Sequence, residues 1–391
     1  MMEPKNPFPE VTEMIVESGA STLSSCMQCG LCTAGCPWRL VKGEISEHFN
    51  NRKVQHMGQL GVDGYESEDI LYACTTCGLC TTRCPREVNS IENTRILRAI
   101  IAETSGLPKS VNPAAGSMSD NGNPWQGERA DRMAWAKGLE IPTFDGSQEY
   151  FLFVCCTSCY DKRSQKIARS IVRVLNEAGV SYGIIGEEES CCGESIRKVG
   201  GEEVFQNTAA QNIELFNSKG VKKIITTSPH CLWTFRNEYP ELGGEYEVIH
   251  YSELFADLIK EGKLKFKNDI GKKVVFHDPC YLGRHSKVFD APRNIIEELP
   301  ATETEDLLRS RTDSLCCGGG GGRVWMETEV GARFGDLRIY EALDKKADIL
   351  ATSCPYCVIM LEASNMALEK DGELEIKDLS ELVCSASLGD E

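Results

Sequence analysis

The sequence lacks the marks of a membrane, secreted or nucleic-acid-binding protein. No apolar run in its 391 residues reaches the roughly 18 residues that a membrane span needs. Its acidic N-terminal stretch has no apolar core of the signal-peptide kind, so we expect a cytoplasmic protein without direct membrane insertion. Positive charge is also scarce. The net charge of −17 repels phosphate backbones and argues against nucleic acid as a partner.

The sequence also lacks the fingerprint of a flavin or nicotinamide site. Its glycine run, Gly318 to Gly322, follows a cysteine pair, not the strand–turn–helix pattern that binds dinucleotides. We interpret the run as a loop that lets the backbone come close to a metal cluster. We expect other redox subunits as partners, carrying a flavin, a hydrogenase-type centre or a membrane cytochrome.

Cysteine is what the sequence has in abundance, with 20 residues grouped in motifs. Thiols in the cytosol are kept reduced and disulfides are rare there, so these cysteines indicate metal or redox chemistry. The rest of the composition, 41% apolar and 26% charged, is that of a globular protein. The length predicts two or three domains.

Two runs near the N-terminus share the spacing C-x2-C-x2-C-x3-C-P, 26-CMQCGLCTAGCP and 74-CTTCGLCTTRCP. In two-cluster ferredoxins the first three thiolates of each run bind one cubane, and the fourth binds the other. Zinc sites do not need this tripled spacing. Residues 1–104 are therefore predicted to form a helical ferredoxin-like domain with two cubane 4Fe-4S clusters, closed by a helix over 90–103 that Ser90 caps. The predicted ligand sets are Cys26, Cys29, Cys32 with Cys84, and Cys74, Cys77, Cys80 with Cys36.

Residues 105–148 are rich in Gly, Pro, Asn, Ser and Asp, which predicts a linker. Trp125 and Trp135 are too apolar for a free tether, so we expect a strap packed over a domain junction. From residue 149 strand and helix patterns alternate, as in α/β folds. The run 150–156 is a predicted strand and 161–180 a predicted amphipathic helix.

The second half of the chain is repeated. Matching cysteines lie 124 to 126 positions apart, and the matched pairs are Cys156 with Cys280, Cys191 with Cys316, Cys192 with Cys317, and Cys231 with Cys357. A near-constant offset is typical of a duplicated domain. The sequence thus predicts a multidomain α+β and α/β protein in which two pseudo-symmetric α/β cysteine-rich domains, residues 149–270 and 271–391, follow the ferredoxin part.

The second copy carries five cysteines, one more than a zinc ion or a cubane takes. Neighbouring thiolates can bind different irons, or one sulfur can bridge two irons. We therefore predict an unusual iron–sulfur site that does chemistry. The five residues are Cys280, Cys316, Cys317, Cys354 and Cys357.

The first copy has Ser228 where the second has Cys354. It keeps four cysteines, which could hold a zinc ion, a cubane or a cluster with a serine alkoxide ligand, or be vestigial. Cys155 or Cys159 could replace the missing ligand, or both could be buried thiols without a ligand role. The tentative metal set of this copy is Cys156, Cys191, Cys192 and Cys231.

From Cys26 to Cys357 these motifs resemble the D subunit of heterodisulfide reductase and its relatives, where a two-cubane subunit is fused to the catalytic subunit. The resemblance implies that the five cysteines of the second copy hold a noncubane 4Fe-4S cluster that takes up electrons and cleaves a disulfide. In that reductase both copies carry full cysteine sets, so Ser228 leaves the second copy as the better candidate. Subunits of sulfate-reducer membrane complexes and of class II benzoyl-CoA reductase complexes also resemble this arrangement.

Disulfide reduction or thiol oxidation is thus the predicted reaction, with a disulfide as the possible substrate. His277 and His285 flank Cys280 and are candidate catalytic proton donors; hydrogen bonding to backbone or cluster sulfur is the alternative. Arg284 and Arg323 could bind an anionic substrate or neutralise cluster charge.

Two other functions fit the same motifs. The chain could be a non-catalytic electron-transfer subunit of a larger anaerobic complex, such as a class II benzoyl-CoA reductase complex. It could also be the iron–sulfur subunit of a lactate or glycolate oxidase, which shares these domains.

Overall fold

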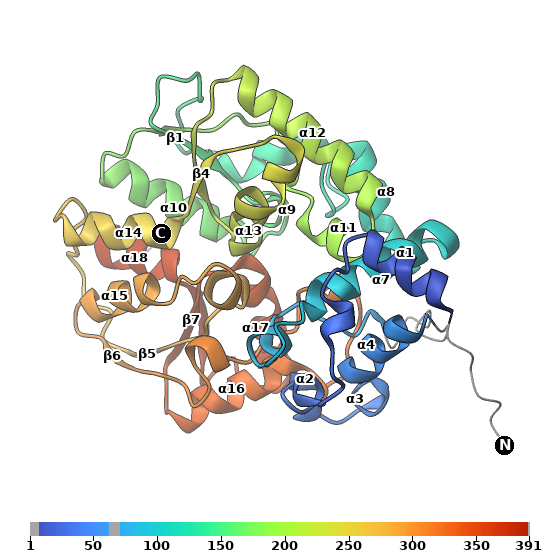
Figure 1. The fold of residues 1–391 in the computed structure, drawn as a ribbon. Helices are drawn as coiled ribbons and strands as arrows, with labels where there is room; N and C mark the ends of the chain where they lie inside the picture. The colour runs from blue at the N-terminus through green and yellow to red at the C-terminus, as the bar shows by residue number, and fades with distance from the viewer. Residues whose placement is uncertain (1–7, 62–70, 390–391) are drawn as a thin grey trace.

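The computed structural model describes residues 8–61 and 71–389. The N-terminal helices lie beside two α/β halves, and the strands of the two halves form separate sheets (Figure 1). Among the described residues, no helix is long and apolar enough to cross a bilayer.

Both sheets have four parallel strands in the same order, which confirms the predicted duplicated α/β architecture. The first sheet has the order β2-β1-β3-β4, from β1 (Tyr150–Phe153), β2 (Tyr182–Gly183), β3 (Lys223–Thr226) and β4 (Glu247–His250). The second has the order β6-β5-β7-β8, from β5 (Lys273–Phe276), β6 (Glu303–Glu305), β7 (Ile349–Thr352) and β8 (Glu375–Asp378). The inner strands are buried and apolar, as expected for sheets covered on both faces.

Helices follow the strands in matching positions. The first copy contains α9 (Cys156–Tyr160), α10 (Gln165–Glu177), α11 (Glu194–Lys198), α12 (Glu202–Ser218), α13 (Pro229–Asn237) and α14 (Tyr251–Lys260). The second contains η5 (Tyr281–His285), α15 (Asp290–Glu298), α16 (Phe334–Asp344), α17 (Pro355–Ala367) and α18 (Leu379–Leu388). Proline, whose fixed φ suits a first helical turn, begins both α13 and α17. This places Cys231 and Cys357 in equivalent first turns at the carboxyl ends of strands.

The two copies share one apolar core. Helix α10 packs against α18, and α14 packs against α15. Because α10 and α15 occupy equivalent positions, as do α14 and α18, these two contacts are equivalent and define a pseudo-twofold arrangement. Ile171 and Leu175 of α10 join Leu382 and Val383 of α18 in this core.

The N-terminal part is helical, as predicted. Its helices are α1 (Pro9–Glu17), α2 (Leu31–Ala34), α3 (Glu44–His48), α4 (Asn51–Leu60), α6 (Leu79–Thr82) and α7 (Ser90–Ser105). The prediction that Ser90 caps the last helix was wrong by one residue. Asn89 is the N-cap of α7, and its side-chain oxygen accepts from the Glu92 amide at 3.2 Å.

Residues 105–148 contain α8 (Asn112–Asn121) and the 3₁₀ segment η3 (Arg129–Ala136). Trp135 is 2% exposed and packs in the core shared by the two copies. Trp125 is partly buried and contacts the ring of Tyr356 at a centroid distance of 6.4 Å. The segment is therefore a packed strap that bridges both copies, with more helix than its composition suggested.

Candidate iron–sulfur centres

The outer ferredoxin set lies near the surface. Cys26, Cys29, Cys32 and Cys84 line one small pocket, which joins the first three thiols of one run to the last thiol of the other. Cys29 is exposed, and the side chains of Met27 and Leu31 beside it are 59% and 49% exposed. An electron donor could therefore approach this site from solvent.

The inner set lies deeper. Cys36 is close enough to Cys74, Cys77 and Cys80 for their charges to raise its pKa, although burial raises it most. Burial also raises the pKa of Cys80 to about 12. Four thiols so close together, Cys77 buried and the other three half-buried, need protons or a cation to be stable, and iron is a soft cation that thiolates prefer.

The five cysteines of the second copy meet in one buried cluster. The five residues belong to one packed cluster, and neighbouring thiols are close enough to shift each other's pKa, Cys280 with Cys316, Cys316 with Cys317, Cys317 with Cys357 and Cys357 with Cys354. Each side chain is at most 6% exposed. The predicted residues are thus together, although they come from the ends of β5 and β7 and from the loop before the glycine run.

The inner ferredoxin set and the second copy touch directly. The side chains of Cys77 and Cys316 lie in the same cluster, and their thiols are close enough to shift each other's pKa. The glycine run makes this approach possible: a Cβ on Gly320 would lie 2.3 Å from the Thr75 carbonyl oxygen, and one on Gly321 would lie 2.4 Å from that of Cys74. The run therefore admits the loop that carries the inner cysteines.

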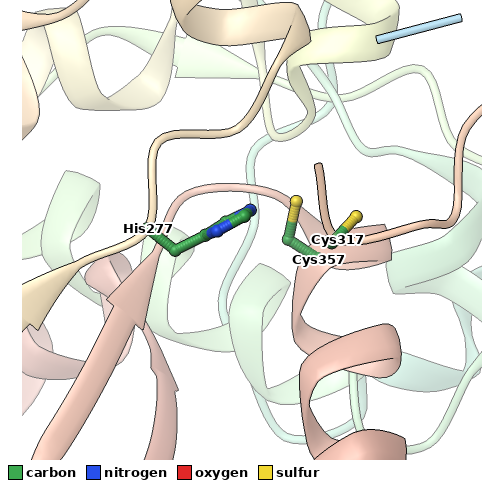
Figure 2. Close-up of side chains that lie close together, drawn as sticks. All are labelled: His277, Cys317 and Cys357. Atoms are coloured by element: carbon green, nitrogen blue, oxygen red, sulfur yellow. The ribbon is translucent and has the colours of Figure 1, made fainter. Parts of the chain in front are cut away.

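His277 faces the second-copy cluster. One of its ring nitrogens and the sulfurs of Cys317 and Cys357 all lie within 4.8 Å of one another (Figure 2). Arg338 Nε donates to His277 Nδ1 at 3.1 Å, so the ring proton belongs on Nε2, which has no hydrogen-bond partner among the described residues. Burial, with the charge of Arg338, lowers the pKa of His277 well below its usual value. The neutral ring can donate an N–H to cluster sulfur.

His285 and Arg284 lie in the π-helical turn η5 and bind backbone. His285 Nε2 lies 3.0 Å from the Thr76 carbonyl, and burial followed by the charge of Arg284 lowers the pKa of His285 to about 3. Arg284 donates to the carbonyls of Cys77 and Ser314 at 2.7 and 2.5 Å. Both side chains thus hold the ferredoxin loop against the second copy.

The first-copy cysteines also meet. Cys156 and Cys191 have their sulfurs 3.3 Å apart, and Cys192 and Cys231 lie in the same cluster, with the Cys192 thiol close enough to those of Cys191 and Cys231 for them to shift its pKa. Cys159, by contrast, packs in the shared core, where its thiol lies 3.7 Å from the Val154 carbonyl.

A layer of side chains between the two sites was not singled out from the sequence. His230 lies beside Cys354 and forms an ion pair with Glu194, its Nδ1 being 3.0 Å from Oε2. Although burial opposes charge on the ring, Glu194 raises the pKa of His230 well above its usual value. Against burial, hydrogen bonds from Cys357 and His230 lower the pKa of Cys354 to about 6. The repeat carried a signal for this, because 229-PHC aligns with 355-PYC and places Tyr356 opposite His230, with ring centroids 5.1 Å apart.

A cavity of about 690 Å³ opens beside this layer and is lined by His285 and Trp233. The ring of His285 stacks on Tyr281 at 4.2 Å, and Tyr281 stacks on His230 at 3.9 Å. Lysine and arginine side chains line the cavity, but Lys198 is paired with Glu238 and Arg284 binds carbonyls. The positive charge of these side chains is therefore not by itself evidence that the cavity binds an anion.

The donor sets fit iron–sulfur clusters. All 20 cysteines lie in the described ranges and none forms a disulfide. The clustered sites offer sulfur in groups of four or five, mostly buried, which suits iron better than hard cations that take oxygen ligands.

Comparison with known proteins agrees with this chemistry. Residues 22–88 match a 4Fe-4S dicluster domain, and residues 150–236 and 274–362 each match a cysteine-rich domain. These matches indicate that the chain binds iron–sulfur clusters.

The chain is 31% identical over 390 residues to the D subunit of the dihydromethanophenazine:CoB–CoM heterodisulfide reductase of Methanosarcina barkeri, covering 93% of this chain and 94% of that protein. It is 39% identical over 303 residues to the probable iron–sulfur-binding oxidoreductase FadF of Bacillus subtilis, and 36% identical over 303 residues to the EtfAB:quinone oxidoreductase of Syntrophomonas wolfei. Those matches cover 75% and 74% of this chain but only 43% and 42% of the two longer proteins. The chain therefore belongs to the heterodisulfide reductase family of iron–sulfur oxidoreductases that the Methanosarcina D subunit represents.

Proposed function

We propose that the chain passes electrons from the outer to the inner cubane of its ferredoxin domain and on to a noncubane 4Fe-4S cluster held by Cys280, Cys316, Cys317, Cys354 and Cys357. We further propose that this cluster serves disulfide reduction or thiol oxidation. The observation that carries the proposal is the close approach of two ligand sets, since Gly320 and Gly321 admit the loop of the inner cysteines and the thiols of Cys77 and Cys316 each shift the pKa of the other. Bound clusters would supply one electron each, and a disulfide takes two.

The order of the sites follows from their burial. The outer set includes exposed Cys29, whereas Cys77 of the inner set and all five cysteines of the second copy are buried. A donor can therefore reach the outer site, and the inner site lies between it and the second copy. Such a sequence from solvent to interior is what a subunit needs if it receives electrons from another protein.

Residues around the second-copy site prepare its sulfurs for charge. Hydrogen bonds from Cys357 and His230 stabilise the thiolate of Cys354, as its lowered pKa indicates. The Gly318 amide donates to the Cys316 sulfur at 3.3 Å, and His277 can donate from Nε2. Donors to sulfur favour the reduced state of a cluster, because they offset the added negative charge. We assign His277 to this role, and His285 to holding the ferredoxin loop through the Thr76 carbonyl, as alternatives to proton donation.

The second candidate function is electron relay without conversion of a small substrate. The match to a protein named EtfAB:quinone oxidoreductase favours it, because that name gives a protein, EtfAB, as one partner in the electron exchange. In that case the second-copy cluster would meet a partner's redox group in place of a disulfide.

The test of the site is Cys317→Ala in the full chain purified without oxygen. We expect the variant to lose the EPR signal of the second-copy cluster while the ferredoxin cubanes stay reducible. Cys384→Ala, which removes a buried thiol from the shared core, is the matched control and should keep every signal. Unchanged spectra in Cys317→Ala would remove the ligand assignment.

The test of the reaction is oxidation of the protein in the presence of a small thiol. Disulfide chemistry predicts a paramagnetic state that appears only with the thiol and that Cys317→Ala lacks. If no thiol-dependent state forms while the cluster itself is present, the relay function is favoured.

A further inference from the structure

We propose that the first cysteine-rich copy holds a second five-thiolate iron–sulfur cluster and that Cys155, not Ser228, supplies the fifth ligand. The inference rests on the proposed function only in assuming that the chain is loaded with iron–sulfur clusters. It concerns the copy whose motif is incomplete in sequence.

The contacts of Cys155 place it in the ring of first-copy thiols. Its side chain lies in the same apolar cluster as those of Cys156 and Cys231, close enough to both for their thiols to shift its pKa. With the contacts of Cys191 and Cys192 already described, this closes a ring of five sulfurs, each on a side chain no more than 6% exposed. The second copy shows the same number of thiols in contact, although there Cys354 completes the set.

The position of Cys155 on the backbone explains how it could take the place of the missing fifth cysteine. Cys155 is the N-cap residue of α9, at the end of β1, and its amide donates to Thr227 Oγ1 at 2.9 Å. Thr227 directly precedes Ser228, so this hydrogen bond ties Cys155 to the segment where the fifth cysteine is missing. The equivalent position in the second copy is Pro279, which has no side chain able to bind metal.

Ser228 has taken another role. Its Oγ accepts from the His230 amide at 3.3 Å and caps helix α13. Cys354, at the equivalent N-cap of α17, makes no such hydrogen bond. A serine hydroxyl is a good helix cap, whereas a thiol is a weak hydrogen-bonding group. The exchange of Cys for Ser thus stabilises the helix, and the thiol one strand away replaces the lost ligand.

Cys159 does not compete for this role. It lies one helical turn beyond Cys155, and its side chain packs among Ile167 and Ile171 in the core between the copies. The five other thiols gather in a different apolar cluster of the first copy. Cys159 therefore provides a matched control, since it is an equally buried cysteine on the same short helix.

The number of thiols favours an iron–sulfur cluster over zinc. A zinc ion takes four ligands, so it would leave one buried thiol of the five without a metal partner. Both copies also donate an amide to the first sulfur of the cysteine pair, Gly193 to Cys191 at 3.5 Å and Gly318 to Cys316 at 3.3 Å. The two sites thus share donor type, burial and this N–H···S contact.

The experiment compares the full-length wild type, Cys155→Ala, Cys155→Ser and Cys159→Ala after anaerobic purification and reconstitution. Iron, zinc and labile sulfide are counted per chain, and EPR and Mössbauer spectra are recorded. Four four-iron clusters give about sixteen irons. We expect about sixteen in wild type and Cys159→Ala, and a fall toward about twelve or a changed spectrum of one cluster in both Cys155 variants. Unchanged signals of the ferredoxin cubanes show that a variant is folded.

Three results would overturn the inference. One is a wild type with about twelve irons per chain, with or without one zinc. Another is a Cys155 variant with the full iron count and wild-type spectra, and the third is a Cys159→Ala variant that loses the same cluster. If the Cys155 variants lose a cluster as expected but no thiol-dependent state forms in wild type, the inference stands and the disulfide reaction fails.

Discussion

Arg98 holds the ferredoxin part against both cysteine-rich copies, and its replacement tests that junction. The side chain is fully buried in α7. It donates to the Lys198 carbonyl of the first copy at 2.7 Å and to the Gly321 carbonyl of the second at 3.1 Å. It also donates to the carbonyls of Leu71 and Cys74, at 2.8 and 2.7 Å, within the ferredoxin part. One guanidinium therefore ties together three segments that are far apart in sequence.

The expected effect of Arg98→Met follows from the two bonds that cross the junction. A buried acceptor that loses its donor costs about 1–3 kcal/mol. Two such carbonyls therefore cost about 2–6 kcal/mol. Burial of the charged guanidinium is itself unfavourable and lowers the pKa of Arg98, so removing that group offsets part of this cost. We expect junction opening to become easier by about 3 kcal/mol, or roughly 150-fold in the opening equilibrium.

Hydrogen exchange at the amides of Arg323 and Val324 reports that opening, because both donate to carbonyls of the glycine run. The matched control is Arg83→Met, which removes an ion pair with Asp313 across the same junction. The two side chains are 41% and 68% exposed, so that pair contributes about 1 kcal/mol at most. If the protection factors of these two amides in Arg98→Met stay within about five-fold of those in Arg83→Met, at equal iron content, the reasoning is refuted.

Two further predictions concern close packing and burial. Gly321→Ala and Gly331→Ala both place a side chain at positive φ, which costs about 1 kcal/mol. Only at Gly321 does a carbonyl oxygen lie 2.4 Å from the new Cβ, so Gly321→Ala should lower the free energy of thermal unfolding by about 1–3 kcal/mol more than Gly331→Ala does. Equal losses in the two variants would contradict this. Burial, followed by the charge of Arg236, lowers the pKa of His250 to about 3 in the folded chain. Below about pH 6.5 the unfolded chain therefore binds a proton at this histidine that the folded chain does not, and the free energy of unfolding falls as the pH drops. Between pH 7 and 5.5 His250→Asn, which keeps a good N-cap, should lose about 1.4 kcal/mol less than wild type in urea unfolding, whereas exposed His56→Asn should match wild type.

The fold could be predicted because its signals are periodic. The constant offset between matched cysteines and the alternation of apolar strands with amphipathic helices predicted the duplicated α/β pair, which the two identically ordered sheets confirm. The helix of residues 112–121 was missed because composition outweighed its end signals, Pro113 in the first turn and left-handed Gly122 at the end.

The sequence allowed the cysteines of each candidate site to be predicted, but not the contacts that these sites make with residues far away in the chain. Spacing shows which thiols share a loop, yet the contact of Cys77 with Cys316 joins residues 239 positions apart. Nothing local distinguishes Cys155 from Cys159, because the difference depends on which of the two side chains faces the other first-copy thiols and which faces the core between the copies. His230 was not singled out for a related reason, since its neighbours Cys354 and Tyr281 belong to the other copy.

The asymmetry of the repeat follows from the single ferredoxin domain that it serves. After the shared Cys-Cys-Gly, the second copy continues with glycine, and its Gly320 and Gly321 admit the loop of the inner cysteines. The first copy continues with Glu194 and Ser195 at the start of α11. Glu194 pairs with His230 of the same copy, and Ser195 reaches Tyr356 of the second copy at 3.0 Å. One ferredoxin domain cannot lie equally against two equivalent loops, so one loop accommodates it and the other fills the space between the copies. The direct thiol contact with the inner set accordingly belongs to the second copy, whose cysteine motif is complete.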